Sequence, residues 1–118
     1  MNLKKEVFTS LQNLYTTEGN EKGGFISFDF EIVECQNCHI EPENNFTYNF
    51  DDLDRLETYG WATFHTHINK SSNLSKDDYD SFQNWYDLIH FIIGNDGISC
   101  YKVTDRGTVI KEPIVLED

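Results

Sequence analysis

Basic side chains are scarce in this sequence. Nine Lys and Arg stand against 21 Asp and Glu among 118 residues, which gives a formal net charge of −12. Proteins that bind nucleic acid neutralise phosphates with Lys and Arg, and anionic membrane surfaces attract basic segments. The shortage therefore argues against nucleic acid and against a membrane surface as partners.

Long apolar runs, repeats and linkers are also missing. No apolar stretch approaches the roughly 20 residues of a membrane-spanning helix. The charged start of the chain is not followed by an apolar segment, so we expect no signal peptide. The three cysteines are an odd number, which argues against a secreted disulfide framework and for a reducing, cytoplasmic compartment. A chain of 118 residues without a linker predicts one domain over residues 1–118.

Aromatic residues are plentiful. Apolar residues make up 38% and aromatics 14% of the chain. A disordered acidic chain would carry far fewer aromatic residues, and a domain of this length can bury a core without disulfides. We therefore expect a folded globular protein.

Apolar spacing and turn residues predict an alternation of helices and strands. Helices are expected at residues 3–16, 51–59 and 75–86. Strands are expected at residues 25–33, 38–40, 46–49, 61–67, 88–93, 98–103 and 108–111. This order predicts an α/β (α+β) domain with a mixed, mostly antiparallel, curved sheet flanked by helices.

Two histidines, His65 and His67, lie one residue apart on a predicted strand. Alternate residues of a strand point to the same face, so both imidazoles can bind one cation. Asp78, in the first turn of the next predicted helix, offers a third ligand. Zinc accepts His and Asp ligands, and three protein ligands leave one position open for water. The set is typical of a catalytic zinc site rather than a closed structural one.

A zinc-activated water needs a carboxylate that takes its proton and returns it to a leaving amine. Glu21 is the candidate, because it precedes the pair Gly23 and Gly24, where backbone approaches closely and no bulky side chain screens the acid. Ser75 offers a hydroxyl that can polarise a scissile carbonyl, and it is also an N-cap candidate for the helix that follows.

These residues together carry a family resemblance. The segment 21–25 (EKGGF), followed by His65-x-His67, seven residues, Ser75, two residues and Asp78, resembles the JAMM signature of the JAB/MPN metalloproteases. The resemblance covers about residues 1–110. It implies a JAB/MPN-like domain with the layering of cytidine deaminases. It also implies one zinc ion per chain held by His65, His67 and Asp78, with Glu21 as general base and acid and Ser75 stabilising the tetrahedral intermediate.

A narrower likeness lies in residues 35–46, which are similar to the prokaryotic and phage branch of the family, as in the JAB domain of lambda-type phage tail-tip assembly proteins. It implies a bacterial cytoplasm, a gene carried by phage or host, and a substrate peptide of the phage tail or cell wall. A deubiquitinase-like isopeptidase acting on a ubiquitin-like protein is one alternative. A non-catalytic MPN-like scaffold is another. The chain lacks the inserted segments with which larger family members grip ubiquitin, and a homodimer or a companion protein could supply them.

The sequence departs from the family pattern at two positions. Ile68 follows the second histidine where proline is usual, which leaves the metal loop less rigid, and Gly23 stands where cysteine is often found. Neither change removes a ligand. We therefore expect metal binding to be less affected than catalytic efficiency.

Other readings of the histidines and cysteines compete with this one. His65 and His67 could be ordinary partly buried histidines, and His90 most simply belongs to the core or a sheet edge. Cys35 and Cys38 have the spacing of a redox or zinc-ribbon pair, but no second pair exists and no helix opens at them. Metallo-β-lactamases, amidohydrolases and nucleobase deaminases need further His, Cys or Glu residues, or a longer chain, than this sequence contains.

Overall fold

The computed structural model describes all 118 residues and contains eight strands and three helices. The elements are β1 (Asn2–Lys4), α1 (Lys5–Gln12), β2 (Gly23–Ser27), β3 (Ile32–Cys35), α2 (Phe50–Tyr59), β4 (Gly60–Thr66), α3 (Lys76–Asn84), β5 (Ile89–Gly94), β6 (Gly97–Val103), β7 (Val109–Glu112) and β8 (Val115–Glu117). None of the helices has the length and apolar composition needed to cross a bilayer.

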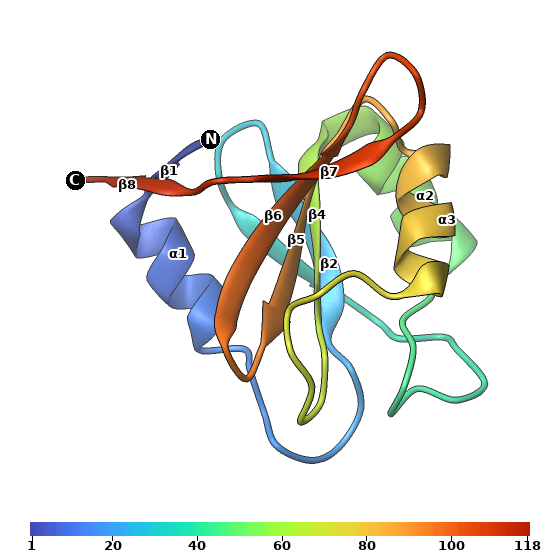
Figure 1. Ribbon diagram of the computed structural model, residues 1–118. Coiled ribbons are helices and arrows are strands. Elements are labelled where there is room, and N and C mark those ends of the chain that lie inside the picture. Colours follow the sequence, from blue (N-terminus) through green and yellow to red (C-terminus); the bar gives the residue numbers. More distant parts are fainter.

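Six strands form a sheet in the order β3-β2-β4-β5-β6-β7. All neighbouring strands are antiparallel except β4 and β5, which are parallel and joined through α3. Helix α1 lies on one face of the sheet, and α2 and α3 lie on the other (Figure 1). The predicted α/β (α+β) class with a mixed, mostly antiparallel sheet is therefore confirmed.

The two ends of the chain form a small sheet that the sequence did not predict. Strand β1 pairs in parallel with β8, with Leu3 opposite Leu116, and the termini lie close together (Figure 1). The helix expected over residues 3–16 consequently begins only at Lys5 and ends at Gln12. Because the partner of β1 comes from the opposite end of the chain, no local pattern could reveal it.

Residues 25–33 form two strands and a turn, where one strand was predicted. The amide of Phe30 donates to the carbonyl of Ser27 at 2.9 Å, and Phe30 adopts a positive φ of 63°. The turn contains no glycine or proline, so it lacked the usual turn signal. The Phe30 ring packs edge-on against Trp61, with ring centroids 5.2 Å apart, which helps to hold this left-handed residue.

The strands predicted at residues 38–40 and 46–49 are wrong. The connection between β3 and α2 is instead a loop organised by the side chain of Asn37. Its amide nitrogen donates to the carbonyls of Glu21 at 2.9 Å and Asn45 at 2.8 Å. Asparagine side chains often offer backbone groups such an alternative to sheet pairing. The loop is thereby tied to the segment that precedes β2.

Alternation along the central strands separates an apolar face from one that carries polar side chains. Phe64 and Phe91 face α1 within a core cluster of nine buried residues. A smaller cluster of Phe82, Ile92 and Tyr101 lies beneath α3. Since Thr63 and His65 alternate with Phe64 along β4, these two polar residues lie on the face that α3 covers.

Candidate metal centre

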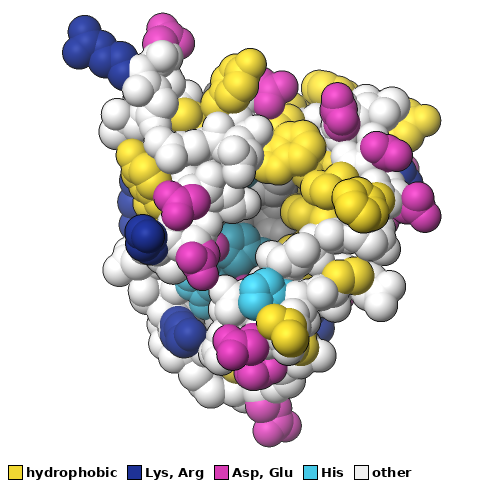
Figure 2. All heavy atoms as spheres, turned by 90° about the vertical axis from the view of Figure 1, so that its right-hand side faces the viewer, with side chains coloured by type: hydrophobic (Ala, Val, Ile, Leu, Met, Phe, Trp, Pro, Cys, Tyr) yellow, Lys and Arg dark blue, Asp and Glu magenta, His cyan; other side chains and the backbone are white.

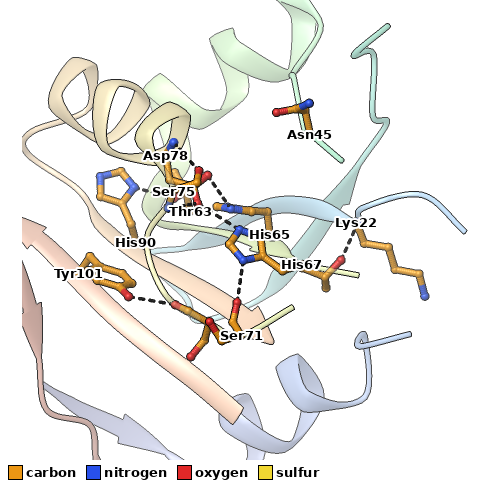
Figure 3. Close-up of polar contacts among 12 residues, drawn as sticks. Lys22, Asn45, Thr63, His65, His67, Ser71, Ser75, Asp78, His90 and Tyr101 are labelled. Atoms are coloured by element: carbon orange, nitrogen blue, oxygen red, sulfur yellow. Dashed lines mark hydrogen bonds and ion pairs between the residues drawn. The ribbon is translucent and has the colours of Figure 1, made fainter. Parts of the chain in front are cut away.

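Two histidines and one aspartate converge at the C-terminal end of β4. The Nε2 atom of His65 lies 3.0 Å from Oδ1 of Asp78, and the Nε2 atom of His67 lies 3.0 Å from Oδ2. One ligand atom from each residue lies within 4.8 Å of the others, and both histidines are buried. Figure 3 shows the two imidazoles turned towards Asp78. This group could hold a metal ion.

The position of Asp78 follows from the way α3 begins. The Ser75 hydroxyl accepts a hydrogen bond from the Asp78 amide at 3.1 Å, and the Asp78 carboxylate accepts one from the Ser75 amide at 3.2 Å. This reciprocal capping box confirms Ser75 as the N-cap. Because Oδ2 faces both the cap and His67, the start of the helix orients the carboxylate towards the histidines.

His67 is held in one orientation by a backbone group. Its Nδ1 atom lies 2.8 Å from the carbonyl oxygen of Ser71, an acceptor only, so Nδ1 carries a proton and donates it. Burial by itself would lower the pKa of His67, but hydrogen bonds to Asp78 and Ser71 raise it above its ordinary value. The arrangement leaves Nε2 directed at Asp78.

His65 contains a buried nitrogen without a hydrogen-bond partner. Its Nε2 lies 3.0 Å from Oδ1 of Asp78, at ion-pair distance, but has no hydrogen-bond partner. Buried polar atoms nearly always have a partner. Burial alone would raise the pKa of Asp78, yet the neighbouring His65 and His67 hold it well below its usual range, so the carboxylate is ionised. A buried nitrogen that lacks a hydrogen bond and contacts an ionised carboxylate fits a cation-binding site.

Glu21 reaches the same place through strand pairing. Gly23 is opposite His65 in the β2–β4 ladder, and continuing this antiparallel register by two residues places Glu21 opposite His67. The side chain of Glu21 is only 4% exposed. Burial raises the pKa of its carboxyl group, and the neighbouring His65 and His67 oppose that shift.

The backbone of Glu21 is held on both sides. Its amide donates to the carbonyl of Pro42 at 2.8 Å, and its carbonyl accepts from Asn37 at 2.9 Å. The space above Gly23 is filled by a neighbouring side chain. A Cβ atom there would lie 2.7 Å from the ring of Phe46, which covers this glycine. Gly23 therefore makes room for the loop that forms one wall of the site.

All five predicted site residues line a single cleft of about 430 Å³: Glu21, His65, His67, Ser75 and Asp78. Figure 2 shows this face of the molecule hollowed beside histidine side chains, with apolar side chains gathered along one rim. Ser75 is exposed at the cleft. Its oxygen accepts from the Asp78 amide, so the hydroxyl proton is free to be donated to a ligand.

His90 lines the cleft as well, which the sequence did not indicate. Its Nε2 donates to the carbonyl of Trp85 at 3.0 Å, so its Nδ1 accepts from the hydroxyl of Thr63 at 2.6 Å. The ring stacks on Phe82 with centroids 4.1 Å apart. His90 is buried, which confirms the expectation of a core histidine. Its hydrogen bonds join Thr63 of β4 to Trp85 at the end of α3, and they depend on the parallel pairing of β4 with β5.

We expect His90 to make the stability of the metal-free protein depend on pH. Burial lowers its pKa from 6.5 to about 4. Between these values the unfolded chain binds more protons, so the free energy of unfolding falls as the pH is lowered through this range. The total loss is on the order of 3 kcal/mol. Urea unfolding at several pH values should show a smaller loss in His90→Gln than in the wild type. Equal pH slopes in His90→Gln and wild type would contradict the expectation.

Comparison with known proteins finds similarity at the level of the fold. No protein-family model and no curated protein sequence matches the chain. The chain is similar to the solution structure of protein DSY2949 from Desulfitobacterium hafniense, with a TM-score of 0.65 and 18% sequence identity over 99% of this chain and 92% of that one. At this identity, the likeness concerns the mixed α/β architecture alone.

Proposed function

We propose that the protein is a zinc-dependent metallopeptidase of the JAB/MPN type that hydrolyses a peptide or isopeptide bond. The observation that carries the proposal is the convergence of His65, His67 and Asp78, with the buried Nε2 of His65 left without a hydrogen-bond partner. A buried acid, Glu21, lines the same cleft. Two histidines and a carboxylate are a ligand set that zinc accepts with a position to spare.

Different residues of the cleft have different roles in amide hydrolysis. Zinc bound by His65, His67 and Asp78 would supply Lewis-acid polarisation and lower the pKa of a water molecule. Glu21 accepts a proton from the attacking water and later donates it to the leaving amine. Ser75 donates a hydrogen bond from its hydroxyl to the carbonyl oxygen as negative charge develops there.

The burial of these groups favours an enzyme over a non-catalytic scaffold. Removing a carboxylate from water is unfavourable unless it is paired. Burial therefore raises the pKa of Glu21. A protein that only presents a binding surface has no need to retain a buried acid beside an unpaired histidine nitrogen. Raised carboxyl pKa values beside a cleft are common at sites of acid–base chemistry.

For the substrate, the likeness of residues 35–46 to the phage branch favours a peptide of a phage tail or bacterial cell wall. An isopeptide bond to a ubiquitin-like protein is the alternative. Both contain an amide carbonyl and an amine leaving group, so the chemistry above applies to each. The two substrates differ in the groups that flank the scissile bond, which are a short peptide in one case and a ubiquitin-like protein in the other.

Metal analysis combined with a hydrolysis assay tests the proposal. We expect about one zinc ion per chain after native purification, and hydrolysis of either cell-wall and tail peptides or an isopeptide-linked ubiquitin-like protein. EDTA should abolish hydrolysis and added zinc should restore it. A protein that takes up no zinc from a zinc-containing buffer, or that hydrolyses its substrate equally well in EDTA, would refute the proposal.

A further inference from the structure

The connection between β4 and α3 is residues 67–75, and its segment 68–74 links His67 to the start of the helix that carries Asp78. It contains no proline, since the only two prolines are Pro42 and Pro113. Proline would restrict the backbone of such a loop. Another feature must therefore hold the loop in the conformation that brings the ligands together.

That feature is the β5–β6 hairpin, which binds Ser72 through three hydrogen bonds. The Ser72 amide donates to Oδ1 of Asp96 at 2.8 Å. Its hydroxyl lies 2.6 Å from the hydroxyl of Ser99, and its carbonyl accepts from the hydroxyl of Tyr101 at 2.9 Å. The Ser72 amide, hydroxyl and carbonyl thus all bind the hairpin, and the residue is 3% exposed.

The loop and the hairpin also approach each other closely. The amide of Asn95 donates to the carbonyl of Lys70 at 2.8 Å. A Cβ atom at Gly94 would lie 2.3 Å from the amide nitrogen of Ser72, which leaves no room for any other residue. Backbone contacts on both sides of Ser71 therefore fix the loop against the hairpin.

Ser71 transmits this anchoring to the candidate metal ligand. Its carbonyl accepts the hydrogen bond from Nδ1 of His67 at 2.8 Å, and it precedes Ser72 directly. Figure 3 shows Tyr101 bonded to this loop and the loop bonded to His67. With Nδ1 protonated, Nε2 of a neutral imidazole is the nitrogen that can bind a metal ion.

We propose that Asp96, Ser99 and Tyr101 are positioning residues, which hold the Ser71 carbonyl in place and thereby select the ring orientation and tautomer of His67. The expected effect of these residues on metal binding rests on the proposed function. The hydrogen bonds that position His67 involve protein groups only and do not depend on a metal ion. Groups that orient a metal-binding histidine typically change metal affinity by about 10- to 100-fold when they are removed.

Two substitutions remove two of the three hydrogen bonds between the hairpin and Ser72. Tyr101→Phe removes only the hydroxyl, and Asp96→Ala removes the acceptor for the Ser72 amide. The matched controls are Tyr86→Phe, an exposed tyrosine, and Asn95→Ala, whose contact with the loop is through its backbone. We expect the double variant Asp96→Ala/Tyr101→Phe to bind zinc about 10- to 100-fold more weakly than wild type. The controls should bind as wild type does.

A second readout separates positioning from general stability. In metal-free wild type, at a pH high enough for His67 to be neutral, nitrogen NMR should show the Nδ1-protonated tautomer, and the variants should show a mixture of tautomers. If the variants lose stability but keep the pure tautomer and wild-type zinc affinity, the inference is wrong. Should the double variant fail to fold, Tyr101→Phe alone decides by the same two measurements.

The outcome is independent of whether the protein proves to be a peptidase. If wild type binds zinc but hydrolyses no peptide, the proposed function fails, while zinc affinity and tautomer still decide the role of the hairpin. If wild type binds no zinc, the tautomer of His67 in the metal-free variants decides it. An unchanged tautomer there would overturn the inference.

Discussion

Replacing Glu21 with glutamine is expected to lower kcat for amide hydrolysis by about 10²- to 10⁴-fold while zinc remains at one ion per chain. Glutamine preserves the size of the side chain but cannot accept the proton of the attacking water. Glu21 does not belong to the group of potential ligands, so the metal should stay bound. Steady-state kinetics with zinc analysis of the same sample measures both quantities.

The stability of Glu21→Gln gives a check on correct folding. Burial raises the pKa of Glu21, which means that the fold disfavours its charged form. A neutral amide should therefore leave the free energy of unfolding at neutral pH unchanged or higher. Glu18→Gln, an exposed acid in the same segment, is the matched control and should keep full activity. Full activity in Glu21→Gln would remove Glu21 from the mechanism.

Replacing Asp78 with asparagine is expected to weaken zinc binding by more than about 100-fold, beyond the loss typical of groups that only orient a ligand. The carboxamide can still accept the hydrogen bond from the Ser75 amide, so the capping box of α3 can persist. The charge that faces both histidines is lost. Zinc titration against a competing chelator measures the affinity, and circular dichroism shows whether the helix persists.

Asp77→Asn separates coordination from the general effect of negative charge. Asp77 lies in the same first turn and also lines the cleft, but it is not part of the His65, His67 and Asp78 group. We expect this control to bind zinc within a few-fold of the wild type. Equal losses in the two variants would show that charge near the helix start, rather than coordination by Asp78, explains the result.

Residues whose relation is local could be placed from the sequence. His65 and His67 share a face because side chains alternate along any strand. Ser75 and Asp78 are three residues apart, which is the spacing of a capping box at the start of a helix. In the structure, His65 and His67 lie together with Asp78, and Ser75 and Asp78 form the capping box. The spacing in the sequence predicted both arrangements.

The sequence could not place residues that meet only because strands far apart in the chain pair with each other. The position of Glu21 opposite His67 follows from the register of β2 against β4. His90 reaches the cleft because β5 is parallel to β4 at one register, and a shift by one residue would turn it to the other face. Residues 38–40 and 46–49 were predicted as strands, yet backbone groups of Asn45 and Thr47 bond to the side chain of Asn37 instead of a sheet neighbour.

The sequence alone determined the acidic character of the protein, its mixed α/β class and the two short spacings that supply the candidate ligands. Those properties depend on composition and on neighbours a few residues apart. Only the tertiary structure decided that the termini pair as β1 and β8, that Glu21 enters the cleft, and that Asp96 and Tyr101 hold the loop behind His67. Strand register and loop anchoring arise from contacts between distant segments, and many such pairings are compatible with the same local pattern.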